Sequence, residues 1–237
     1  MEALADYPFQ CRWRKLKIPS TLSKRLVDAC RPGHDTMSIN INGYLNRYRN
    51  ARERLFDARN ELEVWHKVVL CIGFALLTAL AAQVRIYLGF TPVPITLQVF
   101  VVLLAGIVLG KWWGGISQGM YIGMGAAGLP VFSNFAGGPE TLTGVTGGYI
   151  FGFVLAALFI GHMVDSYPKS RNFLPMIGLM LLGVGIIYLF GALQLAFILH
   201  LTAGQAMLFG VLPFIGGDIA KAIGASFLAT AILPKKA

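Results

Sequence analysis

Charged residues are scarce in this 237-residue chain, and they become rare beyond residue 66. Charged side chains make up 13% of the sequence, whereas a soluble domain carries about 25%. Residues 1–66 contain twelve of the twenty Lys and Arg residues and eight of the eleven Asp and Glu residues. The other 171 residues hold eleven charges in a chain that is 56% hydrophobic. This distribution excludes a soluble globular protein and predicts an all-α integral membrane protein with a basic N-terminal extension.

Cysteine is scarce too, and the three residues Cys11, Cys30 and Cys71 lack the spacing of metal ligands. We therefore expect free thiols, no metal site and no cofactor. The sequence also lacks the phosphate-binding pattern G-x-x-x-x-G-K-[ST], so this chain does not hydrolyse ATP and any ATP-driven pump needs other chains. The net charge of +9 does not require nucleic acid, because the cytoplasmic flanks of membrane helices collect Lys and Arg.

The N-terminal extension divides into two parts. Residues 1–43 are basic and show no periodic pattern, so we expect them to be poorly ordered, with Met37 as an alternative start. From 44 to 66 apolar side chains recur every four and three residues, which predicts a cytoplasmic amphipathic helix. Its stripe consists of Tyr44, Tyr48, Ala51, Leu55, Ala58, Leu62 and Trp65. The stripe suits a helix on the membrane surface or against the bundle, or a short coiled-coil contact with a partner.

Residues 67–237 are predicted to form a membrane domain of six spanning helices. The predicted spans are 67–89, 97–109, 115–127, a fourth that ends near 164, 174–199, and a sixth that contains 212–221 and continues to 233. Pro92 and Pro94 forbid a regular helix after the first span. Residues 110–114 are expected to form a tight turn with an interfacial cation and two Trp. The glycine-rich segment 128–149 is too broken to span and is expected to pack over a cavity.

The distribution of Lys and Arg predicts the orientation of these spans. The N-terminal extension, Lys111, Lys169, Arg171 and the tail residues Lys235 and Lys236 all fall on one side, whereas the three opposite loops contain no Lys or Arg. We therefore expect both termini in the cytoplasm of a multi-pass cell-membrane protein.

An acid and a base, Asp218 and Lys221, lie three residues apart inside the sixth span. On a helix this spacing places both side chains on one face. Each charge at membrane depth costs roughly 2.5–3.5 kcal/mol, so such groups usually have a function. The pair suits a site for a zwitterionic or anionic small molecule, although an ion pair that only holds helices together fits the same pattern.

Five segments in order resemble the BioY biotin transporters, which are substrate-capturing S components of energy-coupling factor (ECF) transporters. They are TPVPITLQVF at 91–100, LAGIVLG at 104–110, GLPVF at 128–132, TGGYIFGF at 146–153 and PFIGGDIAK at 213–221. The resemblance covers about 68–233 and implies a six-helix protein that binds biotin from outside with high affinity. It also implies a transmembrane coupling subunit and ATPase subunits as partners, besides membrane lipid, with biotin as cargo.

The resemblance also implies which residues bind the substrate. Lys221 suits the valerate carboxylate of biotin and Asp218 suits the N–H groups of the ureido ring. Asn134 is a second candidate for the ureido group, Tyr149 for a wall against the thiophane ring, and Gln98 a weaker candidate. A turn asparagine and an ordinary packing aromatic remain the alternatives for Asn134 and Tyr149. Because no cation lies between Lys111 and Lys169, the glycine-rich segment 128–149 supplies no second positive charge for the carboxylate of biotin.

Ala75 and Ala79 form a small-xxx-small pair in the first span. The resemblance assigns this face to docking on the coupling subunit, and ordinary packing inside the bundle is the alternative.

Two further functions fit parts of the sequence. An S component for another small vitamin would also use Asp218 and Lys221. An intramembrane enzyme would need Asp165, His162 and His200 in one site, but the predicted topology puts the two histidines on opposite sides, and no catalytic residue is predicted.

Overall fold

The computed structural model describes residues 41–234. The residues 1–40 of the extension, including Met37, lie outside the described part of the chain. The chain divides into two compact units, 1–48 and 49–237, and helix α2 (Ile41–Glu61) begins in the first and ends in the second. The second unit contains the predicted membrane domain.

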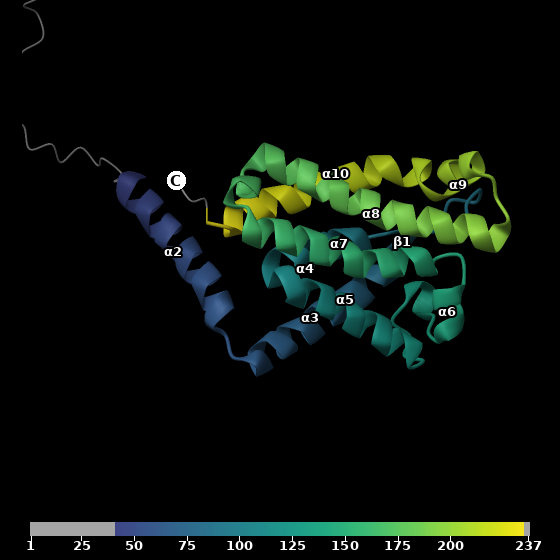
Figure 1. Cartoon of the computed structure of the whole chain (residues 1–237), viewed down its shortest axis with the longest axis horizontal. Coiled ribbons are helices and arrows are strands. Elements are labelled where there is room, and N and C mark those ends of the chain that lie inside the picture. The colour runs from purple at the N-terminus through teal and green to yellow at the C-terminus, as the bar shows by residue number, and fades with distance from the viewer. Residues whose placement is uncertain (1–40, 235–237) are drawn as a thin grey trace, which may run out of the picture. The chain divides into compact units, whose positions relative to one another are not determined.

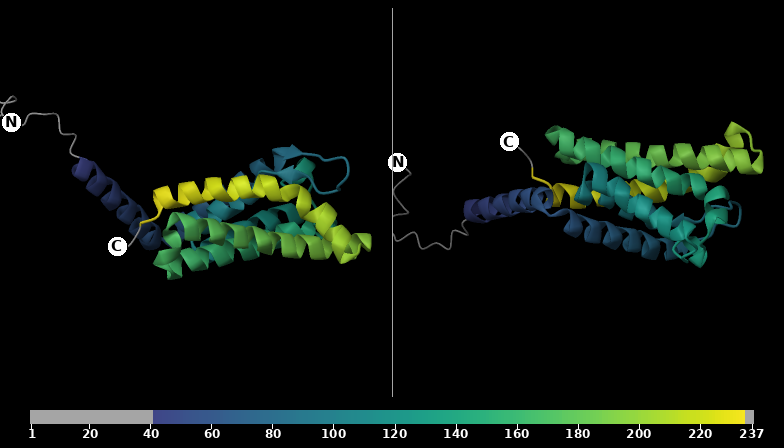
Figure 2. Two further views of the ribbon diagram at one scale, coloured as in Figure 1. Left: turned by 90° about the horizontal axis from the view of Figure 1, so that it is seen from above. Right: turned by 60° about the horizontal axis from the view of Figure 1, so that its bottom comes forward.

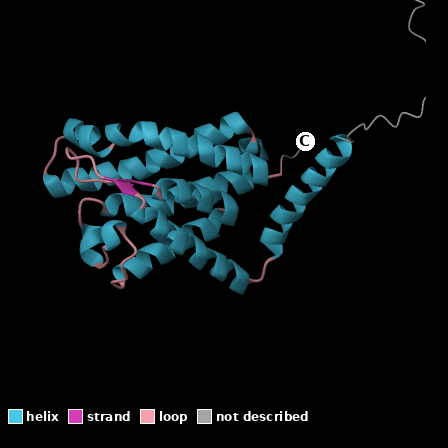
Figure 3. Cartoon of the chain, turned by 180° about the vertical axis from the view of Figure 1, so that it is seen from behind, coloured by secondary structure: helices cyan, strands magenta, loops and turns pink. Residues whose placement is uncertain are grey.

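The second unit is a bundle of helices with one short β-ladder (Figures 1 and 3). The longer helices are α3 (Val64–Gln83), α4 (Gln98–Leu109), α5 (Lys111–Ala126), α7 (Gly147–Ser166), α8 (Phe173–Leu199) and α10 (Leu212–Ile232). The short elements are β1 (Arg85–Ile86), β2 (Ile95–Thr96), η2 (Ser133–Phe135), α6 (Pro139–Thr143), η3 (Pro168–Arg171) and α9 (Ala203–Gly210). Among the described helices, α3, α7, α8 and α10 are long and apolar enough to cross a membrane. The all-α membrane class is therefore confirmed.

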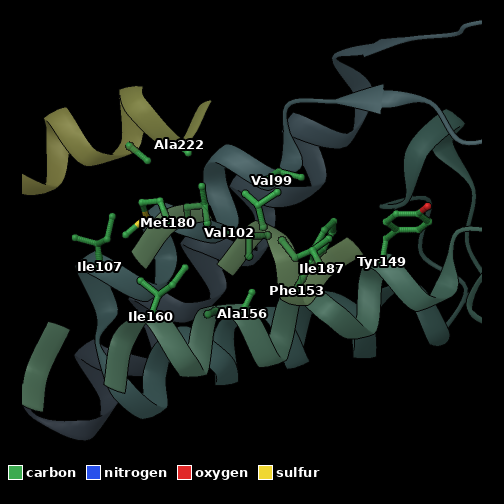
Figure 4. Close-up of a cluster of buried hydrophobic side chains, with 14 of the residues drawn as sticks. Val99, Val102, Ile107, Tyr149, Phe153, Ala156, Ile160, Met180, Ile187 and Ala222 are labelled. Carbon is green, nitrogen blue, oxygen red and sulfur yellow. The ribbon is translucent and has the colours of Figure 1, made fainter. Parts of the chain in front are cut away.

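Helix α4 lies at the centre of the bundle and packs against α3, α5, α7, α8 and α10. A helix that is apolar all round is typical of a fully surrounded position. Its side chains Val99, Val102 and Ile107 meet Phe153 and Ile160 of α7 in the core (Figure 4). Helices α8 and α10 run side by side along the same core, as the left view in Figure 2 shows.

Two helix ends differ from the sequence prediction. Backbone pairing in the β-ladder ends the first helix earlier, and a turn at a single glycine starts the third helix earlier. The first span was expected to reach residue 89, but α3 ends at Gln83 and Arg85–Ile86 pairs antiparallel with Ile95–Thr96. The predicted turn at 110–114 reduces to Gly110, whose φ of 82° reverses the chain, so α5 begins at Lys111.

A short helix that the predicted spans did not include, α9, begins at Ala203 with a capping box between Thr202 and Gln205. A break at Val211 then separates α9 from α10, which has Pro213 in its first turn. This break starts α10 at the end of the bundle where β1, α6 and α9 lie (Figure 1).

Helix α2 packs on the bundle with a different face from the predicted stripe. Tyr48, Ala51 and Ala58 of the stripe are exposed. The packed face carries Arg52, which donates to the carbonyl of Thr230 over 2.8 Å. One turn further on, the guanidinium groups of Arg59 and Arg171 both lie over the Phe56 ring, 4.4 and 4.3 Å from its centroid. Guanidinium–aromatic and charged contacts hold the helix on the bundle. The exposed apolar stripe therefore remains available for the membrane surface or a partner, the other two alternatives for this helix.

Candidate functional site

A cavity lies inside the bundle, next to the end formed by β1, α6 and α9. Helices α4, α5, α7, α8 and α10 form its walls. The β-hairpin, which consists of β1, β2 and the residues between them, and the glycine-rich segment 128–149 cover it. The space between the lining atoms, counted out through the open mouth and including solvent there, amounts to about 660 Å³. The lining residues are Val93, Pro94, Thr96, Gln98, Val99, Tyr121, Phe132, Ser133, Thr141, Thr146, Tyr149, Ile150, Phe153, Ile187, Tyr188, Phe214, Asp218 and Lys221. The expectation that the glycine-rich segment packs over a cavity is confirmed.

Asp218 and Lys221 both line this cavity and form an ion pair, with Nζ of Lys221 2.6 Å from Oδ1 of Asp218. Nζ also donates to the carbonyl oxygen of Thr96 over 2.7 Å, and the hydroxyl of Tyr188 donates to Oδ2 of Asp218 over 2.7 Å. Only 3% of Asp218 is exposed. Both charges are therefore compensated by hydrogen bonds that come from α8 and from the β-hairpin as well as from α10.

Gln98 belongs to a second polar group on the cavity wall. Its Nε2 donates to the hydroxyl of Tyr121 over 2.7 Å, and its Oε1 accepts from the hydroxyl of Thr96 over 3.1 Å. The Tyr121 hydroxyl donates in turn to the carbonyl of Val131 at 3.3 Å. This network fixes the side chain of Gln98 and connects α4 to the start of the glycine-rich segment.

Tyr149 forms part of the wall, and its hydroxyl is already engaged by the carbonyl of Gly210 at 2.7 Å. Its ring packs on Gly191, where an added Cβ would approach the ring to 2.3 Å. Only the ring of Tyr149 is thus available to a ligand. Phe132 packs edge to face on Tyr121, with ring centroids 5.4 Å apart, and extends the apolar surface of the wall.

Asn134 is the predicted site residue that does not line the cavity. It is exposed, has a φ of 65°, and accepts a hydrogen bond on Oδ1 from Arg85 over 2.8 Å. Gln83 reinforces this contact, since its Oε1 accepts from Arg85 and from the backbone N–H of Phe135. The glycine-rich segment carries no cation of its own, but the β-hairpin brings Arg85 against it.

Its neighbour Ser133 lines the cavity instead. The Oγ atom of Ser133 is buried and has no hydrogen-bond partner within residues 41–234. Buried hydroxyl groups are nearly always paired, so this oxygen is available to a ligand or water in the cavity.

Thr96, Ser133 and Tyr188 are polar cavity residues that the sequence prediction did not include. Thr96 lies within the segment 91–100, and Tyr188 lies among apolar residues of a long span. A single polar side chain in an apolar span is the signal that was available for Tyr188, because a buried tyrosine hydroxyl needs a partner.

The structure places Ala75 inside the bundle rather than on an outer face. Ala75 is completely buried and belongs to the central core, and Ala79 is half-buried against the same core. The neighbouring Leu76 and Leu80 are exposed instead. Intramolecular packing, the alternative considered for this pair, therefore describes Ala75.

Replacing Ala75 with leucine is expected to destabilise the isolated protein. Extra methylenes in a packed core cost about 1–3 kcal/mol, so the thermal midpoint should fall in detergent solution. The half-buried Ala79→Leu change is the comparison and should cost less. An unchanged midpoint for Ala75→Leu would contradict the internal position and restore Ala75 as a partner-facing residue.

The residues considered for an enzyme do not meet. Asp165 pairs with Arg59 at 2.6 Å, and His162 contacts Ser166 one turn apart on α7. His200 follows the end of α8, and α8 runs antiparallel to α7. Within the described residues, no group of three or more His, Cys, Asp or Glu side chains could hold a metal ion.

Comparisons with known proteins agree on one family. The BioY family model matches residues 52–236. A Methanothermobacter thermautotrophicus protein described as a probable biotin transporter BioY is 46% identical over 140 residues, 56% of this chain and 89% of the relative. The Thermotoga maritima biotin transporter BioY is 42% identical over 156 residues, 66% of this chain and 89% of the relative. The crystal structure of the S-component for biotin from an ECF-type ABC transporter matches with a TM-score of 0.65 at 28% identity, covering 70% of this chain and 89% of that chain.

Proposed function

This chain belongs to the BioY family, and we propose from that membership and from the Asp218–Lys221 cavity that it captures biotin and carries it across the membrane. It is a membrane transporter component and not an enzyme. The observation that carries the proposal is the ion pair on a wall that is otherwise mostly apolar. Biotin has the matching chemistry, with an apolar bicyclic ring system, ureido N–H donors and a carboxylate.

In the proposed complex, the carboxylate of biotin binds the Lys221 ammonium and the ureido N–H groups bind Asp218 or Ser133. Because the valerate chain separates the two polar ends of biotin, Lys221 has to turn away from Asp218 when biotin binds. The flexible four-carbon stem of lysine permits this change. Tyr188 continues to donate to Asp218, so the carboxylate of Asp218 keeps one partner throughout. Tyr149 and Phe132 supply apolar surface to the ring, and Gln98 supplies a fixed polar edge.

Equilibrium binding of labelled biotin to the purified full-length chain tests this proposal, with unlabelled vitamins as competitors. We expect unlabelled biotin to displace the label and other vitamins to leave it bound. Displacement by a different vitamin at lower concentration would assign the chain to the other substrate class.

We also propose six membrane crossings with both termini in the cytoplasm. Helix α4 has 12 residues and spans only about 18 Å as a regular helix. The extended segment before it, which contains β2, lies at the outer end and completes the crossing. The short α5 returns from Gly110. This arrangement opens the biotin cavity to the outside.

Labelling of single cysteines in intact cells tests the orientation. In a background without Cys11, Cys30 and Cys71, an impermeant thiol reagent should label Thr143→Cys and leave Lys169→Cys unlabelled. Both positions are exposed, so accessibility differs only by side of the membrane. The reverse labelling pattern would contradict the orientation and the outward-facing cavity.

As an S component, the chain would work with a transmembrane coupling subunit and ATPase subunits. The outer face of α3, which carries the exposed Leu76 and Leu80 beside the half-buried Ala79, is our candidate for the coupling contact. Ala79→Leu on this face should reduce energised uptake while leaving biotin binding intact.

A further inference from the structure

A second cavity lies at the end of the bundle opposite the biotin site, between the end of α2, the starts of α3 and α5, and the end of α7. Its polar lining includes Arg59, Lys67, Lys111 and Asp165, and its apolar lining includes Leu70 and Leu109. Trp112 and Trp113 border it as well. Tryptophan next to basic residues at the end of a membrane helix is typical of the headgroup level.

The charged groups of this cavity differ in whether they form an ion pair. Both carboxylate oxygens of Asp165 are engaged, because Oδ1 accepts from Arg59 over 2.6 Å and Oδ2 accepts from the backbone N–H of Lys111 over 2.9 Å. Nζ of Lys67 donates to the backbone carbonyl of Asn60 over 3.0 Å. Nζ of Lys111 lies 5.1 Å from the centroid of the Trp112 ring.

Neither lysine pairs with a carboxylate within residues 41–234. The nearby Glu61 and Glu63 are exposed and form no ion pair with either of them. The cavity therefore keeps two ammonium groups uncompensated.

We propose that this cavity binds the phosphate of an anionic phospholipid from the cytoplasmic leaflet. Two ammonium groups with remaining donors suit phosphate oxygens, and Leu70 and Leu109 suit the first carbons of the acyl chains. A soluble phosphate would use the lysines but leave this apolar lining in water. Since the lining joins the end of α2 to α3 and α5, the bound lipid also ties α2 to the membrane bundle.

Native mass spectrometry of the full-length chain released from nanodiscs tests the site. The nanodiscs contain phosphatidylglycerol and phosphatidylcholine in equal amounts, and the readout is the ratio of the two lipids that remain bound. Each lysine is expected to contribute about fivefold to this preference, so Lys67→Gln/Lys111→Gln should lower it roughly twenty-five-fold. Lys67→Arg/Lys111→Arg keeps the charges and should retain most of the preference.

The matched control is Arg54→Gln/Lys169→Gln, which removes two exposed cations outside the cavity. It should leave the lipid ratio and the thermal midpoint unchanged. An equal fall in both double variants would show general surface attraction and overturn the site. Inorganic phosphate and added phosphatidylglycerol are also compared as competitors for the bound phosphatidylglycerol. If inorganic phosphate releases it at the same concentration as added phosphatidylglycerol does, the lipid assignment is overturned in favour of a soluble phosphate.

Discussion

Replacing Lys221 with methionine should weaken biotin binding by roughly tenfold to a hundredfold or more. Methionine keeps an unbranched apolar stem and removes the charge that the proposed carboxylate contact needs. Nζ of Lys221 now contacts Asp218 and Thr96 at 2.6 and 2.7 Å. Equilibrium binding of two ligands separates the roles: biotin should lose much more affinity than a derivative whose tail is a neutral amide, because only biotin offers a carboxylate.

The double variant Asp218→Asn/Lys221→Met tests the alternative that the two residues only neutralise each other. In that case the double change should restore both the thermal midpoint and biotin binding, because no buried charge remains unpaired. Equal losses for both ligands in Lys221→Met, with rescue in the double variant, would contradict the carboxylate contact. They would instead indicate that the Asp218–Lys221 ion pair stays intact when biotin is bound and does not contact its carboxylate.

The sequence predicted the parts of the fold that depend on local composition. Helices α4 and α8 match their predicted spans within one residue at each end, because uninterrupted apolar runs between turn residues mark them. Asp218 and Lys221 meet as expected because their spacing of three residues fixes one face of a helix. Their place in one cavity with Gln98 and Tyr149 is also found in the structure.

What remained unpredicted depends on contacts between distant segments. Tyr188 reaches Asp218 from another helix, 30 residues away. The ladder between Arg85–Ile86 and Ile95–Thr96 has only two residues in each strand, too few for alternation to be recognised. Pairing there turns Arg85 toward Asn134 and leaves Ser133 facing the cavity. The face that α2 packs on the bundle likewise depends on distant partners, because Arg52 and Arg59 hold it through contacts beyond the helix.

Asp218→Asn should weaken the binding of biotin and of the amide derivative to a similar extent, because both ligands retain the ureido ring. The change also leaves the Lys221 ammonium without its carboxylate in a site where only 3% of residue 218 is exposed. Hydrogen bonds to charged groups contribute about 1.5–3 kcal/mol, so we expect the affinity for both ligands to fall roughly tenfold to a hundredfold. The fall is smaller if the amide oxygen of the new asparagine still accepts a hydrogen bond from the ureido group. The same titrations with both ligands measure it.

Tyr188→Phe is a milder test of the same carboxylate. It keeps both charges and removes one hydrogen bond of 2.7 Å to Oδ2, which at about 1.5 kcal/mol corresponds to roughly a tenfold loss for both ligands. Tyr167→Phe, at an exposed tyrosine outside the cavity, is the matched control and should bind normally. If Asp218→Asn and Tyr188→Phe bind both ligands as tightly as the unmodified chain, Asp218 does not contact the ureido group. Its carboxylate would then serve only to hold Lys221 against α8 and the β-hairpin.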